Sequence, residues 1–225
     1  MSIVVNHWAT EQIPYSWNQK CVQLAWSGSD QAAVADPAWQ NTDISYCYNA
    51  QGFRTYDLVS LYNKEVDIAL GCSFTEGIGL PAEIIWPSLI EQQSDLPLLN
   101  LGLGSGSTDT VARILTNVAG LYRIRTVYIL WPVPERFELC TKNHIVPMVP
   151  NRSGIEHTWF HDDANSDNRF NKNQAITKQL AGLYGFQIKE RQARDPWAVL
   201  GDLARDCVHN GIQSHQNLVN MFLNS

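Results

Sequence analysis

The most regular hydrophobic pattern in the chain lies between residues 66 and 131, where three short apolar runs are bounded by turn residues. The first run, over 66–71, carries Val, Ile, Ala and Leu and stops at a glycine, which predicts a buried strand. The runs over 97–101 and 125–131 have the same character, and the prolines at 132 and 134 end the last one. We therefore expect three buried strands.

The segments between these runs predict helices. One helix is expected over about 83–92. A second is expected over about 108–122, with Ser107 or Thr108 as its N-cap and Asp109 in the first turn, where the helix dipole favours a negative charge. Strand, helix, strand, helix and strand with short connections are typical of a parallel sheet with right-handed crossovers. The pattern therefore predicts an α/β fold.

The C-terminal part of the chain continues this alternation less clearly. A helix over about 171–184 should end at Gly185, and residues 186–189 predict a short strand. We expect a helix over 197–204, a turn over 206–211 and a final helix over 214–222. The last helix would bury Leu, Val and Phe side chains on one face.

Two regions lack such periodicity and divide the chain. Residues 1–60 hold half of the eight tryptophans among Ser, Asn, Asp and Pro, and predict an irregular arm packed on a main domain over 61–225. The indoles either pin this arm to the domain or line a pocket for a sugar or acyl group. Within the arm, 46–54 alternates before a turn at Gly52. Residues 135–170 predict an inserted loop in the main domain.

Composition narrows the class of protein. A chain of 225 residues with 44% apolar and 17% charged side chains is globular and long enough for one sizeable core. A net charge of −6 leaves no basic stripe, so we expect no nucleic-acid partner. No apolar run approaches the roughly 20 residues of a membrane helix, and the first residues do not resemble a signal peptide. We therefore predict a protein that is cytoplasmic or otherwise soluble, with no membrane partner.

The cysteines and histidines predict neither a disulfide framework nor a cofactor. The five cysteines are scattered and include no CxxC pair, which favours reduced thiols: Cys21, Cys47, Cys72, Cys140 and Cys207. Cys72 could act as a nucleophile itself or form a redox pair with Cys207, although two buried inert thiols are the simpler interpretation. The cluster of His157, His161, Asp162 and Asp163 could hold a metal ion or form an exposed polar loop; we expect no metal and no cofactor.

Candidate chemistry gathers at the end of the first strand. Ser73 follows Gly71 and Cys72 there, where the carboxyl ends of parallel strands open onto a ligand crevice. Asp206 and His209 lie three residues apart before the last helix. A carboxylate can hold one imidazole nitrogen while the other faces a serine hydroxyl, which is how a weak serine nucleophile is activated.

These motifs together resemble the SGNH (GDSL-type) hydrolases. The matching blocks, in chain order, are Gly52-Phe53-Arg54, Gly71-Cys72-Ser73-Phe74-Thr75, Asn100-Leu101-Gly102-Leu103-Gly104-Ser105-Gly106-Ser107 and Asp206-Cys207-Val208-His209. The resemblance covers about 45–131 and 202–223. It implies a flavodoxin-like three-layer α/β/α domain with a mostly parallel sheet.

The resemblance also implies roles for individual residues. Ser73 would be the nucleophile, His209 the general base and then acid, and Asp206 its orienter. The oxyanion hole would take backbone N–H groups from Ser73 and from the turn at Gly104, Ser105 and Gly106. The family commonly has Gly where Ser105 stands, and an Asn donor after the third strand, where this chain has Trp131. The indole of Trp131 or a distant Asn such as Asn143 would have to replace that donor.

Three functional hypotheses follow. The first is a serine esterase or O-deacylase acting on a small-molecule or carbohydrate ester without a cofactor. The second is a catalytically impaired binding or structural module on the same scaffold, motivated by the missing Asn, with carbohydrate as a candidate ligand. The third is acyl transfer through the same acyl-enzyme. The sequence pattern predicts neither acyl specificity nor oligomeric state.

Overall fold

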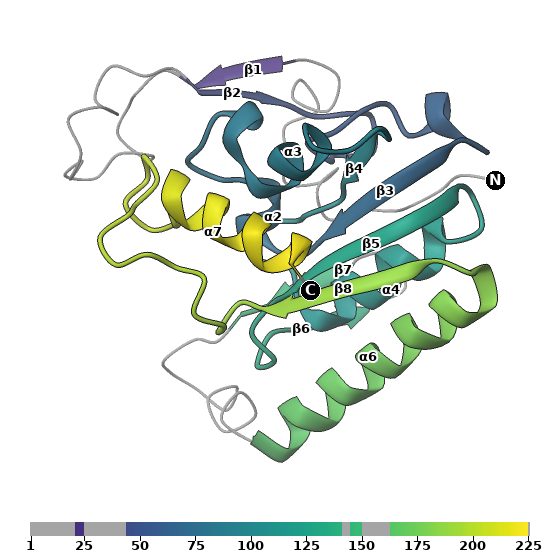
Figure 1. Cartoon of the computed structure of the whole chain (residues 1–225). Helices are drawn as coiled ribbons and strands as arrows, with labels where there is room; N and C mark the ends of the chain where they lie inside the picture. The colour runs from purple at the N-terminus through teal and green to yellow at the C-terminus, as the bar shows by residue number, and fades with distance from the viewer. Residues whose placement is uncertain (1–20, 25–43, 141–144, 150–162, 225) are drawn as a thin grey trace.

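The computed structural model of the chain describes residues 21–24, 44–140, 145–149 and 163–224. Its centre is a four-stranded parallel sheet with the strand order β4-β3-β5-β8 (Figure 1). The strands span Glu65–Leu70 (β3), Leu98–Asn100 (β4), Arg123–Trp131 (β5) and Gln187–Gln192 (β8). The three buried strands and the short later strand are therefore confirmed, and so is the α/β fold.

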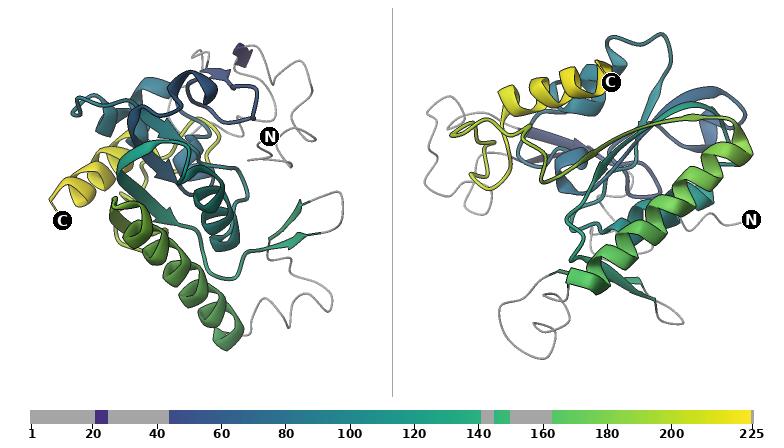
Figure 2. Two further views of the ribbon diagram at one scale, coloured as in Figure 1. Left: turned by 90° about the vertical axis from the view of Figure 1, so that its right-hand side faces the viewer. Right: turned by 60° about the horizontal axis from the view of Figure 1, so that its bottom comes forward.

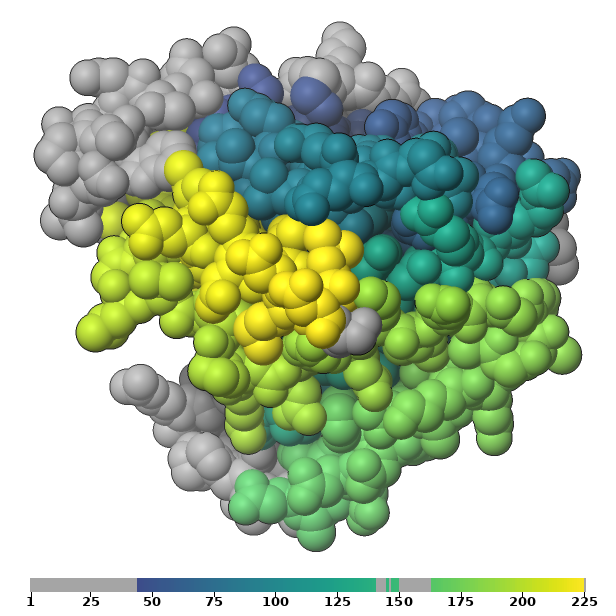
Figure 3. All heavy atoms as spheres, in the orientation of Figure 1, coloured from purple at the N-terminus to yellow at the C-terminus, as the bar shows by residue number. Residues whose placement is uncertain are grey.

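Helices cover both faces of this sheet and give three layers (Figure 1). One face packs against α4 (Thr108–Val118) and α6 (Asp163–Tyr184), and the other packs against α3 (Trp86–Glu91) and α7 (Ile212–Leu223). The side chains of β3 alternate between the two cores: Val66, Ile68 and Leu70 face one, and Ala69 faces the other. In Figure 3, α7 lies at the surface beside the segment that carries α3.

Two helices differ in detail from the prediction. The helix expected over 83–92 is divided into a 3-10 turn, η4 (Ala82–Ile84), and α3, because Ile85 between them is extended and Pro87 starts a new helix. Helix α4 ends four residues early at Val118. Ser107 is its N-cap, and its hydroxyl and the Thr110 hydroxyl satisfy each other's backbone N–H.

The prediction of an irregular loop over 135–170 is wrong in two places. β6 (Phe137–Cys140) and β7 (Ile145–Met148) form an antiparallel hairpin, which stands away from the main sheet in Figure 2. Helix α6 begins at Asp163, eight residues before the expected start. Its buried residues Ser166, Asn173 and Thr177 are polar, so the hydrophobic period that marks a helix is absent there.

The helix predicted over 197–204 does not form. Gly201 has a φ of 80°, in the left-handed region, and the segment makes turns instead. Trp197 is buried while Leu200 is fully exposed, so the apolar side chains do not share one helical face. The turn that follows is as expected, and α7 begins at Ile212, two residues before the predicted start.

The N-terminal arm is described only in part. β1 (Cys21–Leu24) pairs antiparallel with β2 (Ile44–Cys47), and a 3-10 turn, η3 (Val59–Leu61), precedes β3. All four of its tryptophans lie outside the described residues: Trp8, Trp17, Trp26 and Trp39. The division into an arm over 1–60 and a domain over 61–225 stays a prediction.

One cysteine prediction needs correction. Cys47 is disulfide-bonded, and the register of the two strands places Cys21 directly opposite it. Since disulfides are rare in the cytosol, the cytoplasmic prediction loses the support it took from reduced thiols. Free thiols are found at Cys72, Cys140 and Cys207. No helix in the described part of the chain is long and apolar enough to span a membrane.

Candidate active site

Ser73 lies at the carboxyl end of β3, as the first residue of a short helix, α2 (Ser73–Glu76). Gly71 allows the close turn between strand and helix, because a Cβ at this position would lie 2.1 Å from Thr75 Oγ1. Cys72 is extended and is the N-cap of α2. The serine is thereby presented at the edge of the sheet where parallel α/β folds bind ligands.

His209 and Asp206 approach Ser73 from the loop that precedes α7. His209 Nε2 lies 2.8 Å from Ser73 Oγ, and His209 Nδ1 lies 2.5 Å from Asp206 Oδ2. The side chains of His209 and Asp206 are 16% and 10% exposed, so both hydrogen bonds are shielded from water. The structure brings together these three predicted residues in an order that lets the imidazole take the serine proton.

The loop that carries His209 is held largely by its own atoms. The carbonyl of His209 accepts a hydrogen bond from the N–H of Ala204 at 2.9 Å. Asp206 Oδ1 accepts from the N–H groups of Val208 and His209, at 3.1 and 3.0 Å. Cys207 has a φ of 55°, which reverses the chain between Asp206 and His209. Short-range bonds therefore set the spacing of the pair.

The charge of Asp206 suits the role of an orienter. Burial by itself would raise the pKa of this carboxyl, but hydrogen bonds from the His209 ring and backbone outweigh burial and lower the pKa below its ordinary value. Asp206 is therefore ionised at neutral pH, opposite the nitrogen that becomes positively charged when His209 takes a proton. Phe74 packs edge-on against the His209 ring, with centroids 5.2 Å apart, and limits its rotation.

Two of the four candidate backbone N–H groups are available for an oxyanion. The N–H of Gly104 donates to Glu76 Oε2 at 2.6 Å, and the N–H of Gly106 donates to a carbonyl of the same turn at 2.9 Å. The other two, from Ser73 and Ser105, have no hydrogen-bond partner within the described part of the chain. These two N–H groups are the candidates for binding a negatively charged oxygen.

Ser105 keeps its N–H in place at a conformational cost. Its φ is 60°, in the left-handed region that glycine adopts far more readily. The Glu76 carboxylate stabilises this turn through the N–H of Gly104, and it also accepts a hydrogen bond from the Tyr48 hydroxyl at 2.7 Å. Burial raises the pKa of the Glu76 carboxyl above its ordinary value, although the Tyr48 and Gly104 hydrogen bonds and the charge of Arg54 oppose the rise.

Trp131 does not belong to this site, which corrects its prediction as an oxyanion donor. Its indole N–H donates to Glu190 Oε2 at 2.8 Å, and its ring packs edge-on against Phe170 in the core. The side chain is fully buried because Trp131 is the last residue of a central strand. Asn143, the other replacement considered, lies outside the described residues.

Sequence reasoning missed the residues that support the nucleophile turn. Arg54 is buried, and its guanidinium donates to the carbonyls of Gly77 at 2.7 Å and Leu80 at 2.9 Å, just after α2. Asn100 Nδ2 donates to the carbonyl of Thr75 at 2.9 Å. Both residues belong to the motif blocks quoted above. The presence of Arg54 in one of these blocks was the sequence signal that could have assigned it a role near the nucleophile turn.

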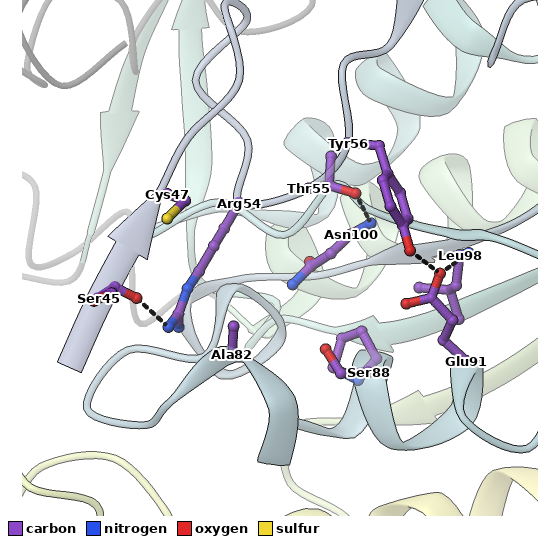
Figure 4. Close-up of a pocket in the computed structure, with 11 residues that line it drawn as sticks. Ser45, Cys47, Arg54, Thr55, Tyr56, Ala82, Ser88, Glu91, Leu98 and Asn100 are labelled. Atoms are coloured by element: carbon purple, nitrogen blue, oxygen red, sulfur yellow. Dashed lines mark hydrogen bonds between the residues drawn. The ribbon is translucent and has the colours of Figure 1, made fainter. Parts of the chain in front are cut away.

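A cavity of about 270 Å³ is lined in part by the two residues that support the nucleophile turn, and it does not include Ser73, Asp206 or His209 (Figure 4). Arg54 and Asn100 line it, together with Tyr56 and Glu91, whose hydroxyl and carboxylate are 2.8 Å apart. Neither Ser73 nor His209 lines this cavity. It is a void beside the supporting residues.

Cys72 does not fit the role of a nucleophile. It is fully buried, and burial raises the pKa of its thiol, which disfavours the reactive thiolate. Cys207 is half-buried, and its thiol contacts the carbonyl of Arg205 at 3.8 Å. Of the four His and Asp residues considered as an alternative metal cluster, only Asp163 lies in the described part, at the start of α6.

No protein-family model matches the chain, and no curated protein matches it. Several solved structures resemble it weakly, among them the three that follow. A protein assigned to the G-D-S-L lipolytic family, from Desulfitobacterium hafniense DCB-2, is 16% identical, with 71% of this chain and 97% of that chain covered and a TM-score of 0.37. LAE5, an alpha/beta hydrolase enzyme from the metagenome of Lake Arreo, Spain, is 18% identical, with 72% and 94% covered and a TM-score of 0.36.

The third is an extracellular lipase from Streptomyces rimosus, 13% identical, with 72% of this chain and 98% of that chain covered and a TM-score of 0.34. At such TM-scores these likenesses carry no functional argument. The strand order and the three layers described above establish the fold, and the hydrogen bonds at Ser73 carry the functional argument.

Proposed function

We propose that the chain is a serine hydrolase that cleaves an ester or O-acyl group through an acyl-enzyme on Ser73. The observation that carries the proposal is the continuous hydrogen-bonded path from Ser73 Oγ through the His209 ring to Asp206. A serine hydroxyl is a weak nucleophile, and this path supplies both the base and the group that orients it. The two N–H groups of Ser73 and Ser105 without described partners support the same reaction.

The proposed reaction proceeds in two halves. His209 Nε2 takes the proton from Ser73 Oγ as this oxygen attacks the carbonyl carbon, and Asp206 stabilises the resulting imidazolium. The C=O oxygen becomes negatively charged and accepts hydrogen bonds from the N–H groups of Ser73 and Ser105. His209 then protonates the leaving alkoxide as its bond to carbon breaks. In the second half, His209 takes a proton from water as the water oxygen attacks the acyl-enzyme. His209 then returns this proton to Ser73 Oγ as the bond from Oγ to the acyl carbon breaks, and the acid product leaves and ionises in solvent.

Covalent labelling tests the proposal directly. A fluorophosphonate probe should modify the protein, and mass spectrometry should locate the adduct on Ser73. Ser73→Ala should abolish labelling, whereas Ser88→Ala, a serine that lines the cavity of Figure 4, should label normally. Labelling that persists in Ser73→Ala would overturn the proposal.

Turnover separates this proposal from a catalytically impaired binding module, which the missing Asn favours. The hydrolase should release p-nitrophenol from p-nitrophenyl acetate, and His209→Ala should reduce kcat by at least about 10³-fold because the proton path is broken. A protein that neither labels nor turns over any small ester would instead support the binding module.

A further inference from the structure

The chain leaves strand β5 beside the nucleophile. β5 pairs in parallel with β3, and Leu70 lies opposite Ile129 in this pairing. A Cβ built on Gly71 would lie 2.8 Å from the carbonyl oxygen of Leu130, so the two strand ends are in close contact. The segment that follows Trp131 therefore emerges next to the turn that presents Ser73.

This segment turns back at once and carries an arginine. The N–H of Arg136 donates to the carbonyl of Val133 at 3.2 Å, which closes a turn over 133–136. Arg136 is half-buried, and its Nε is fully buried without a hydrogen-bond partner. The acidic neighbour Glu135 is ion-paired with Arg194 instead. Within the described residues, no carboxylate or carbonyl accepts from the guanidinium of Arg136.

The positive charge of Arg136 acts on the residue next to the nucleophile. Burial raises the pKa of the Cys72 thiol, and the charge of Arg136 is one of the influences that oppose this rise. This influence agrees with the placement of the 133–136 turn beside the strand end that carries Cys72 and Ser73. An unpaired, partly buried guanidinium is well suited to bind an anion, because its N–H groups are strong donors and are only weakly hydrated.

We propose that Arg136 is a third donor to the oxyanion that forms during attack by Ser73. The inference rests on the proposed hydrolase function. Its N–H groups would bind the carbonyl oxygen of the substrate more strongly as that oxygen becomes negatively charged, which is the condition for accelerating the reaction. The side chain thus contributes a donor at the strand end where Trp131 does not.

Kinetics of Arg136 variants in the full chain test this role. With the neutral substrate p-nitrophenyl acetate, Arg136→Gln should lower kcat by about 10²-fold and change KM by less than about twofold, since the interaction forms mainly in the transition state. Arg136→Lys should retain part of the rate, and added guanidinium ion at millimolar concentration should partly rescue Arg136→Ala. Arg123→Gln, at an exposed position at the start of β5, is the matched control and should keep its kcat.

A tetrahedral inhibitor gives an independent readout. An alkylboronic acid forms an adduct on the serine that carries a negative oxygen, so Arg136→Gln should weaken its binding by about the same factor as kcat. Thermal unfolding followed by circular dichroism checks that the variants are folded. An unchanged kcat and inhibitor affinity in a folded Arg136→Gln would overturn the proposal.

Two further outcomes separate this proposal from the proposed function. If only a carboxylated ester such as p-nitrophenyl hemisuccinate loses kcat/KM in Arg136→Gln, the arginine recognises an anionic substrate and the proposal is overturned. Slower fluorophosphonate labelling of Ser73 in Arg136→Gln supports it. A wild-type protein that neither labels nor turns over overturns both proposals, whereas normal labelling and turnover in Arg136→Gln overturns this one alone.

Discussion

The loop that carries His209 and the turn that carries Ser73 are stabilised in opposite ways. In the loop, most of the hydrogen bonds that set the geometry join residues fewer than ten positions apart, such as Ala204 with His209 and Asp206 with Val208, and one long-range bond runs from the N–H of Arg205 to the carbonyl of Gly79. In the turn, the support comes from positions more than 20 residues away, through Arg54 and Asn100. The base and its orienter are thus a local motif, and the nucleophile is held by the rest of the domain.

This difference determines how each half of the site should respond to substitution. A change in the loop should remove chemistry and leave the fold intact, because few other parts of the molecule depend on it. A change behind the turn should cost stability first, because buried carbonyls would lose their donors. The variants below test this contrast from the largest expected effect to the smallest.

Asp206→Asn should have the largest effect, on activity alone. The amide still fills the space but cannot stabilise the imidazolium, and it favours the wrong tautomer of His209, so kcat should fall by about 10⁴-fold. The measurement is p-nitrophenyl acetate hydrolysis. Asp202→Asn is the control in the same loop, since Asp202 accepts from the N–H and hydroxyl of Ser214 at the start of α7. The amide oxygen can still accept both hydrogen bonds, so only the favourable charge near the helix N-terminus is lost; stability should fall by about 0.3–1 kcal/mol and kcat should be kept. Equal losses of kcat would contradict the division of the loop into two roles.

Arg54→Met should destabilise the fold. The guanidinium donates to the carbonyls of Gly77 and Leu80, and to that of Ser45 at 3.0 Å, and Met removes all three hydrogen bonds. The Gly77 carbonyl then keeps only the longer bond from the N–H of Leu80 at 3.3 Å. A loss of about 3–5 kcal/mol in the free energy of unfolding is expected, because each buried group left unsatisfied costs roughly 1–3 kcal/mol. Urea denaturation measures it. Arg123→Met, at an exposed position of β5, should change stability by less than about 0.5 kcal/mol. A loss in Arg54→Met no larger than this would show that the turn is self-supporting.

The same contrast explains what the sequence could predict. Asp206 and His209 are three positions apart, so their spacing is visible in the chain, and apolar runs mark the buried strands equally well. The support of Ser73 depends on tertiary contacts of Arg54 and Glu76, which no local pattern contains. Trp131 was misassigned for a related reason: its strand was predicted correctly, but the partner of its indole, Glu190, lies 59 residues away.

Misplaced elements have equally specific physical causes. Helix α6 was predicted to start too late because it packs against α4 through polar contacts, such as Asn173 Nδ2 to Thr108 Oγ1 at 2.9 Å. Hydrophobic periodicity cannot reveal an interface of this kind. The segment before Asp202 has helix-forming residues but reverses at Gly201, where the backbone is left-handed.

His215, in the helix that follows the His209 loop, makes the stability of the protein depend on pH. This histidine is buried in α7, and its Nδ1 accepts a hydrogen bond from the N–H of Trp86 at 2.9 Å. Burial lowers the pKa of His215 from 6.5 to about 4. The unfolded chain therefore binds the proton first as the pH falls below 6.5, and stability should decrease by about 3 kcal/mol between pH 7 and pH 4 from this group alone.

The matched variant is His215→Asn, whose side-chain oxygen can accept the same N–H but does not titrate. Urea denaturation of both proteins at pH 7 and pH 4 gives the effect as a difference of differences, so that other titrating groups cancel. The loss should be about 3 kcal/mol smaller in the variant. Equal losses in the two proteins would mean that protonation of His215 does not weaken the packing of α7, so that the His209 loop and α7 do not depend on this buried histidine.

Ser105→Gly should produce the smallest effect, and a stabilising one. Ser105 has a φ of 60°, and relieving a left-handed residue gains about 1–2 kcal/mol, of which the greater freedom of unfolded glycine removes about 0.5–1 kcal/mol. The net gain of about 0.5–1 kcal/mol should be measurable by urea denaturation. Because the N–H is retained, kcat should stay within about twofold of wild type. Ser105→Ala keeps both the strain and the N–H and should match wild type in both measurements. A large loss of kcat in Ser105→Gly alone would mean that the strained backbone of Ser105 is needed to direct its N–H toward the oxyanion. The position of this donor would then depend on restraint by the surrounding structure, as the position of Ser73 does.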